Sequence, residues 1–194
     1  MMKSTHSYFR SSGYQTNAMI DTDSGNQLDI ASLPPFLRTL LVMDGTVTKA
    51  LESWFWEPVN IVPLSNQQQD NSQNLQREVL LRGEKSSNIF ACARSQVSLE
   101  SLPNDMAKAL SEGTMGIGEI LREKGLETYR ELFNINYLKG ISKDDSLLGN
   151  LAETDIVSRS YKIWVNQKSA ITVTEYFPLQ LYSQSSSNAN LIGK

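Results

Sequence analysis

Two pairs of short segments, in which apolar and polar residues alternate, constrain the fold of this chain most. The first pair spans residues 77–97, where the polar turn "GEKSSN" separates "REVLLR" from "IFACARSQV". The second pair spans residues 158–179, where "NQK" separates "SRSYKIWV" from "SAITVTEYFPL". Alternation with a period of two and a short polar connection are typical of a β-hairpin. The sequence therefore predicts two hairpins with four antiparallel strands.

Helical spacing of apolar residues precedes and separates these hairpins. Residues 33–45 begin with two prolines and residues 46–58 with a threonine that can cap a helix, so together they predict a helical hairpin. Residues 102–113 and 114–133 also have a helical pattern, and three glycines near their junction give the backbone freedom to bend. The polar stretch 65–74 predicts a surface loop.

Hairpin strands with helices between them indicate the α+β class, an antiparallel β-sheet with helices packed on it. The 194 residues are enough for one domain, which we place at residues 31–183. Residues 1–30 are rich in small polar residues and are expected to be disordered, and residues 184–194 are expected to form a flexible tail.

One ionisable side chain lies among apolar neighbours in each of the four strands, because alternate residues share a face. These side chains are Arg77, Arg94, Arg159 and Glu175. Burying an unpaired charge is costly, so they need partners of opposite charge, either one another or a ligand. Three arginines against one glutamate favour an anionic small molecule, because guanidinium groups bind carboxylates in a bidentate manner. The glutamate is able to donate or accept a proton.

A purely structural role is the alternative for each of these four side chains. A buried Arg–Glu pair is often only structural, and a strand arginine can extend its charge to the edge of a sheet. Arg94 is the weakest candidate, because Gln96 shares its face and a β-bulge would change its register. The presence of all four favours a ligand site.

Composition argues against several classes of function. The net charge is −3 and the basic residues are scattered, so no nucleic-acid interface is expected. His6 is the only histidine and Cys92 the only cysteine, so neither a histidine metal site nor a Ser-His-Asp triad is expected, and no metal is predicted. No apolar run approaches the about 20 residues of a membrane-spanning helix.

A single cysteine fits a reducing compartment, and a cytoplasmic location is the default expectation. The serine-rich start with Lys3 and Arg10 offers a plastid transit peptide as the alternative, although Asp21, Asp23 and Asp29 argue against it. The default expectation for assembly is a monomer.

Five motifs occur in an order that resembles the chorismate pyruvate-lyase family, including its cyanobacterial and plastid branch. They extend from Leu33 to Tyr182 and read "LLVMDGTVTKALE", "REVLLRG", "FACARSQV", "LSEGTMGIGEIL" and "SRSYKIWVNQKSAITVTEYFPLQLY". The resemblance implies an antiparallel sheet whose helical flaps enclose a buried site. It also implies a cofactor-free lyase reaction that breaks a carbon–oxygen bond, in which chorismate gives pyruvate and 4-hydroxybenzoate for a prenylquinone such as plastoquinone or ubiquinone.

The resemblance also assigns roles to individual residues. Arg77 of "REVLL" matches the arginine that binds the ring carboxylate, and Glu175 of "TEYF" matches the glutamate near the ring oxygen. Ile117 matches an apolar flap residue over the ring, and Thr46 or Val47 matches the contact from the other flap.

A second arginine is expected to neutralise the enolpyruvyl carboxylate, and Arg94 and Arg159 are the two candidates.

The alternative function is a non-catalytic domain that senses a small aromatic acid, because a similar fold is the effector-binding half of some bacterial transcription regulators. Those carry a DNA-binding helix-turn-helix, and the residues before Leu33 are too few and too polar to form one. The enzyme is therefore the expected function.

Overall fold

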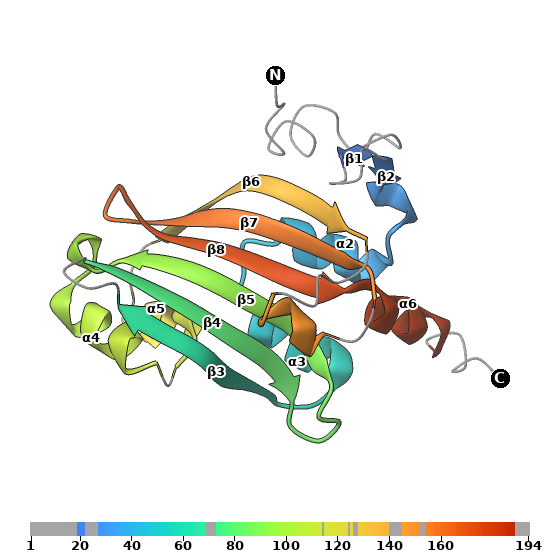
Figure 1. Ribbon diagram of the computed structural model, residues 1–194, viewed down its shortest axis with the longest axis horizontal. Coiled ribbons are helices and arrows are strands. Elements are labelled where there is room, and N and C mark those ends of the chain that lie inside the picture. Colours follow the sequence, from blue (N-terminus) through green and yellow to red (C-terminus); the bar gives the residue numbers. More distant parts are fainter. Residues whose placement is uncertain are drawn as a thin grey trace.

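The computed structural model describes residues 19–21, 27–68, 73–113, 115–123, 125, 128–139, 145–151 and 154–188. Its largest element is a six-stranded sheet with the order β3-β4-β5-β8-β7-β6 (Figure 1). The strands are Val59–Gln68 (β3), Asn74–Gly83 (β4), Ile89–Ser98 (β5), Thr128–Leu138 (β6), Ile156–Val165 (β7) and Lys168–Pro178 (β8). All neighbouring strands are antiparallel, which confirms the α+β class and both predicted hairpins.

Four helices cover one face of this sheet, and α2 and α3 are seen behind it in Figure 1. They are Pro35–Val42 (α2), Val47–Phe55 (α3), Asn104–Glu112 (α4) and Ile117–Glu123 (α5). Apolar side chains of α2 and α3 form one core cluster with the sheet, and those of α4 and α5 form a second. The same face of the sheet thus contacts two helical hairpins.

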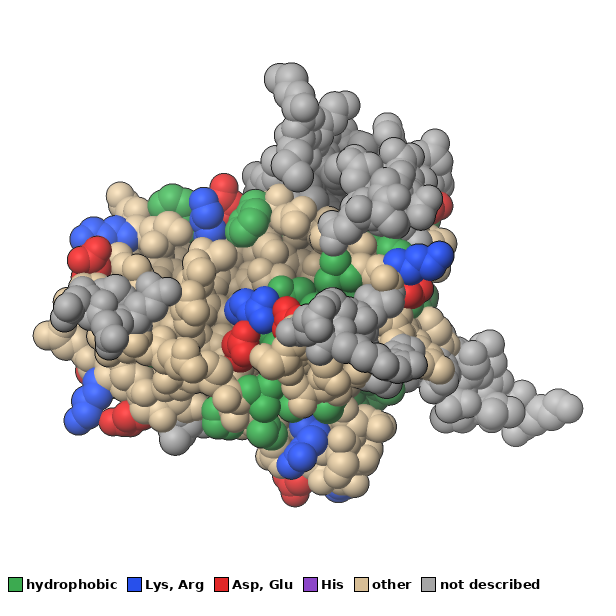
Figure 2. All heavy atoms as spheres, viewed as in Figure 1, with side chains coloured by type: hydrophobic (Ala, Val, Ile, Leu, Met, Phe, Trp, Pro, Cys, Tyr) green, Lys and Arg blue, Asp and Glu red, His purple; other side chains and the backbone are tan. Residues whose placement is uncertain are grey.

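The opposite face carries one short 3-10 helix, Leu148–Asn150 (η3), which packs in a third apolar cluster with Leu80, Cys92 and Ile156. Figure 2 shows few hydrophobic side chains on the visible part of this face, with basic and acidic side chains gathered near its middle. The remaining described elements are the 3-10 helices Ile30–Ser32 (η1) and Leu99–Ser101 (η2) and the C-terminal helix Leu179–Asn188 (α6).

The predicted helical hairpin at residues 33–58 is confirmed as α2 and α3. Helix α2 begins at Pro35, where the missing N–H leaves no hydrogen bond unmade, and it buries Leu37, Leu40 and Leu41 completely. Helix α3 ends at Phe55, and the next residue, Trp56, adopts a left-handed backbone conformation (φ 56°). The turn between the two helices is bound to the sheet by hydrogen bonds from Arg159 to the carbonyl oxygen of Met43 and from Arg130 to that of Asp44.

The predicted helix at residues 114–133 is wrong in its second half. Helix α5 ends at Glu123, and Thr128–Leu138 forms the edge strand β6, which pairs with β7. Gly125 lies between them with a φ of +60°, a conformation that favours glycine and does not continue a helix. The predicted surface loop at 65–74 is also shorter, because residues 65–68 extend β3.

The segments expected to be disordered or flexible, residues 1–30 and 184–194, lie partly outside the described residues, at positions 1–18, 22–26 and 189–194. Within those segments, Met19–Asp21 (β1) pairs with Gln27–Asp29 (β2), and α6 continues to Asn188. Among the described helices, none has both the length and the hydropathy that crossing a membrane requires.

Candidate functional site

A cavity of about 440 Å³ lies between the covered face of the sheet and the starts of α3 and α5. All six strands of the sheet line it from one side, and residues 45–49 and 116–119 line it from the other. The four predicted residues Arg77, Glu175, Ile117 and Val47 all line this cavity, and so does Thr46. Side chains from distant parts of the sequence therefore meet here as expected.

Arg77 lies on β4, directly opposite Ser95 of β5, and only 3% of its surface is exposed. Its Nη2 atom donates hydrogen bonds to the carbonyl oxygens of Met115 at 2.8 Å and Gly113 at 3.4 Å. Among the described residues, no carboxylate forms an ion pair with it. Burial lowers the pKa of this guanidinium below its ordinary value, since nothing nearby compensates the desolvation.

Glu175 lies on β8, between Ala93 of β5 and Arg159 of β7, and is 7% exposed. Its Oε2 accepts a hydrogen bond from Arg159 Nε at 2.7 Å, and its Oε1 accepts one from the hydroxyl of Tyr161 at 3.0 Å. Both carboxylate oxygens are therefore oriented by neighbours on the adjacent strand.

Arg159 is almost fully buried and lies behind Glu175, outside the cavity lining. Its Nη1 donates to the carbonyl oxygen of Met43 at 2.9 Å, and its guanidinium lies over the ring of Tyr161, 5.0 Å from the centroid. Desolvation lowers the pKa of Arg159, but attraction to Glu175 outweighs it, and the net pKa is raised. Burial and the negative charge of Glu175 raise the pKa of the Tyr161 hydroxyl, which therefore keeps its proton.

The structure does not bring Arg94 to this cavity, unlike the other residues predicted from the strands and flaps that line it. Register along β5 places Ala93 and Ser95 on the cavity side and Arg94 on the opposite face, beside Glu78 of β4. An irregularity between Leu81 and Arg82 shifts the pairing at the start of β5, so Phe90 packs in the cavity-side core while Arg94 does not.

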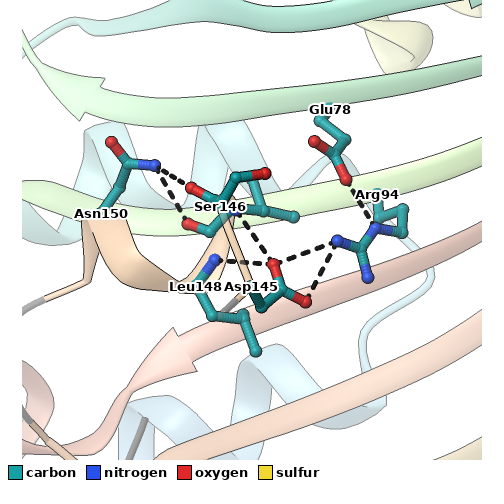
Figure 3. Close-up of polar contacts among 7 residues, drawn as sticks. Glu78, Arg94, Asp145, Ser146, Leu148 and Asn150 are labelled. Atoms are coloured by element: carbon teal, nitrogen blue, oxygen red, sulfur yellow. Dashed lines mark hydrogen bonds and ion pairs between the residues drawn. The ribbon is translucent and has the colours of Figure 1, made fainter. Parts of the chain in front are cut away.

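Figure 3 shows what Arg94 does on that opposite face. Its Nε pairs with Glu78 Oε1 at 2.7 Å, and its Nη2 donates to the two oxygens of Asp145 at 3.1 and 3.2 Å. Asp145 Oδ1 also accepts hydrogen bonds from the backbone N–H groups of Leu147 and Leu148. The three charged groups therefore anchor the segment that leads into η3.

Arg130 is a cavity residue that the sequence interpretation missed. It lies on β6 opposite Ile163 of β7, and its Nη1 donates to the carbonyl oxygen of Asp44 at 2.6 Å. Its Nε is buried and has no hydrogen-bond partner among the described residues. The signal that could have found it is the alternation in "TYRELFNI", which favours a strand as well as a helix.

The entrance to the cavity is lined by charged side chains of α3 and α5. Lys49 and Glu52 form an ion pair of 2.8 Å, and Arg122 on α5 also lines the cavity. The hydrogen bond from Lys49 lowers the pKa of Glu52 despite partial burial. The exposed positions of Lys49 and Arg122 leave these two charges largely solvated.

The two cover segments approach each other through a glycine. A Cβ atom on Gly118 would lie 2.9 Å from Cγ2 of Thr46, closer than real Cβ atoms come to a neighbour. A Cβ on Gly116 would lie 2.4 Å from Cδ1 of Ile61. A Cβ on Gly113 would lie 2.8 Å from Nδ2 of Asn66, so all three glycines predicted to bend the chain lie close against a neighbouring side chain.

The described part of the chain contains no cluster of side chains that could bind a metal ion. No group of three or more histidine, cysteine, aspartate or glutamate side chains gathers there in a way that could hold an ion. Cys92 is buried in the apolar cluster under η3, and burial raises the pKa of its thiol to about 12. It is therefore part of the core.

The fold has relatives among solved structures. The crystal structure of PhnF from Mycobacterium smegmatis matches with a TM-score of 0.51 at 13% identity, over 71% of this chain and 65% of that chain. The chain thus spans less than two thirds of the length of that protein. The effector domain of PhnF from the same organism matches with a TM-score of 0.50 at 13% identity, over 69% of this chain and 88% of that domain. The match is therefore to the fold of the effector domain.

Sequence relatives identify the family. Residues 41–184 match the family model described as Chorismate pyruvate-lyase Rv2949c-like. A chorismate pyruvate-lyase of Mycobacterium leprae (strain TN) is 30% identical over 166 residues, which cover 77% of this chain and 77% of that protein. A chorismate pyruvate-lyase of Mycobacterium tuberculosis (strain H37Rv) is 23% identical over 165 residues, with coverages of 77% and 82%. The chain therefore belongs to the Rv2949c-like chorismate pyruvate-lyase family.

Proposed function

We propose that the protein eliminates pyruvate from chorismate within the described cavity and leaves 4-hydroxybenzoate, which then serves prenylquinone formation. One observation carries the proposal. Arg77, a buried arginine with no carboxylate partner among the described residues, lines the same cavity as Glu175, whose two oxygens are held by Arg159 and Tyr161. This pair suits a substrate with a carboxylate at one end and a reacting ring at the other.

Arg77 binds the carboxylate on the ring. Its Nη2 is already fixed by the carbonyl oxygens of Gly113 and Met115, which orients the guanidinium while its charge stays uncompensated. A carboxylate placed against it restores the interaction that burial removed, and charge-assisted hydrogen bonds of this kind are stronger than neutral ones.

Glu175 acts on the ring at the other end. Because its oxygens accept hydrogen bonds from Arg159 and Tyr161, we assign it the role of proton acceptor. The C4 proton of chorismate moves to Glu175, the C4–H electron pair completes the aromatic ring, and the C3–O bond breaks with its electron pair on oxygen. The departing enolpyruvate takes a proton at its methylene carbon and becomes pyruvate, so atoms and electrons balance without a redox partner.

Residues of the cover complete the site. Ile117 and Val47 line the cavity from the helical side, and Thr46 touches the second cover segment at Gly118. An apolar cover excludes water and holds the substrate in a reactive conformation, which is the main requirement when aromatisation supplies the driving force.

The experiment that tests this function mixes purified protein with chorismate, without metal or nucleotide, and quantifies pyruvate and 4-hydroxybenzoate over time. We expect equimolar release of both products, abolished by Arg77→Ala and retained by Arg82→Gln, which removes an exposed positive charge outside the cavity. Chorismate that persists at the rate of the protein-free control would contradict the proposal.

A second candidate function is supported by the match to the effector domain of PhnF, namely binding of a small aromatic acid without catalysis. The same cavity and the same Arg77 would serve it. Titration calorimetry with 4-hydroxybenzoate separates the two, because binding by a protein that leaves chorismate intact would favour the binding domain over the enzyme.

A further inference from the structure

We infer that Arg130 is the second anion-binding residue of the cavity and binds the carboxylate of the departing pyruvyl group. The inference rests on the proposed function and adds to it the residue that recognises the other end of the substrate. It replaces both arginines that the sequence offered for this role.

Both of those arginines already form ion pairs with carboxylates of the protein. Arg159 lies behind Glu175, pairs with it at 2.7 Å and does not line the cavity. Arg94 lies on the opposite face of the sheet and pairs with Glu78 and Asp145. Arg159 keeps one buried donor, Nη2, without a hydrogen-bond partner among the described residues, but neither its side chain nor that of Arg94 lines the cavity.

Arg130 has the complementary properties. It lines the cavity, it forms no ion pair with a carboxylate among the described residues, and its buried Nε has no hydrogen-bond partner among them. A buried donor without a partner costs free energy that an incoming acceptor would recover. Its Nη1 bond to the carbonyl oxygen of Asp44 fixes the guanidinium in place from the other side.

The strand order puts Arg130 and Arg77 at opposite ends of the cavity. Arg77 lies on β4 and Arg130 on β6, and the three strands β5, β8 and β7 lie between them. Glu175 and Tyr161, on two of these intervening strands, lie in the middle. A dicarboxylate can thus contact one arginine at each end while its reacting bonds face Glu175.

The other basic side chains of the lining are less suited to this role. Lys49 is paired with Glu52, and its side chain is 62% exposed. Arg122 is exposed at the entrance. Exposed charges are screened by water and salt and contribute little to the binding of an enclosed ligand.

This arrangement predicts which carboxylate of each ligand contacts which of the two arginines. Chorismate has two carboxylates and contacts both arginines, whereas 4-hydroxybenzoate keeps only the carboxylate at Arg77. When the C3–O bond breaks, the negative charge that develops on the leaving oxygen and the carboxylate of pyruvate remain at the Arg130 end. Loss of Arg130 should therefore weaken chorismate binding selectively.

The test compares Arg130→Gln, Arg77→Gln and wild type with two ligands. Steady-state kinetics give KM and kcat for chorismate, and titration calorimetry gives Kd for 4-hydroxybenzoate. We expect Arg130→Gln to raise KM about 10- to 100-fold, the usual loss for a charge-assisted hydrogen bond, while the Kd of 4-hydroxybenzoate changes less than about threefold. Arg77→Gln should weaken both ligands, and the charge-matched control Arg82→Gln neither.

Arg130→Lys keeps the positive charge but not the planar pair of guanidinium donors. It provides the same test if Arg130→Gln does not fold. We expect it to raise KM less than Gln does and to retain the wild-type Kd for 4-hydroxybenzoate. A wild-type KM in Arg130→Gln, or an equal loss of both ligands, overturns the inference while leaving the lyase function intact. A wild-type protein that leaves chorismate unreacted overturns both.

Discussion

Arg159 and Glu175 lie directly opposite each other on β7 and β8, and their side chains form a buried ion pair of 2.7 Å at the edge of the cavity. Only the glutamate lines the cavity. The arginine thus acts on a ligand through the glutamate, by fixing its orientation and compensating its charge. The first two predictions separate these contributions.

Replacing the carboxylate of Glu175 while keeping its shape should impair the reaction and spare binding. In Glu175→Gln we expect kcat for chorismate to fall about 10²- to 10⁴-fold, the usual contribution of a positioned proton acceptor. The Kd of 4-hydroxybenzoate should change only a few-fold, because Arg77 still binds its carboxylate. Undiminished kcat would remove Glu175 from the mechanism.

Breaking the Arg159–Glu175 pair from one side should destabilise the fold. Arg159→Met leaves a buried carboxylate without its counter-charge, so we expect the free energy of unfolding in urea to fall by about 3–5 kcal/mol. The double variant Arg159→Met, Glu175→Gln leaves no unpaired charge and should regain part of that loss. A double variant less stable than Arg159→Met alone would show that the ion pair does not control stability here.

Crowding the contact between the two cover segments should affect access to the cavity. Gly118→Ala places a methyl group 2.9 Å from Thr46 Cγ2, so the segments must separate by several tenths of an ångström. We expect kcat/KM for chorismate to fall about 10-fold. Thr46→Ser removes the opposing methyl group, and the combined variant should recover part of the activity. Equal activity of the two Ala-containing variants would mean that this contact does not limit access.

Acid should weaken the structure through Asp145. Burial raises the pKa of this carboxyl, but hydrogen bonds from the Leu148 N–H and the charge of Arg94 outweigh it and lower the pKa below its ordinary value of 3.8. A lowered native pKa stabilises the folded state above the ordinary value, and this contribution is lost as pH falls through the native pKa.

We therefore expect Asp145→Asn to be less stable than wild type by about 1–2 kcal/mol at pH 7, and the difference to shrink below about pH 3.8. Urea unfolding between pH 2.5 and 7 measures it. Because Asp145 lies on the face opposite the cavity, the kcat of the variant at pH 7 should match wild type. A difference that stays constant with pH would contradict the linkage.

Much of the sheet, and the shared face of Arg77 and Glu175, could be predicted because strand alternation is strong in β4, β5, β7 and β8. Arg77 and Glu175 stand alone among apolar residues there, so the face that they share is visible in the sequence. The face of Arg94 was harder to read. Both faces of β5 carry small apolar residues, and only the pairing with β4 determines which one meets the cavity.

Arg130 was missed for a different reason. The stretch "TYRELF" combines residues that favour helices with residues that favour strands, and its local pattern alone does not decide between them. Pairing with β7, a contact between residues far apart in the chain, selects the strand and turns Arg130 toward the cavity. A prediction made from each segment separately does not include the energy of this strand pairing.

The contact between Gly118 and Thr46 joins two parts of the chain that lie about seventy positions apart and that both line the cavity. Neither segment closes the cavity alone, so the lifetime of an enclosed molecule depends on how often the two separate as well as on how tightly it is held. Substitutions in either segment can therefore change the rate of exchange with solvent while every contact inside the cavity stays the same.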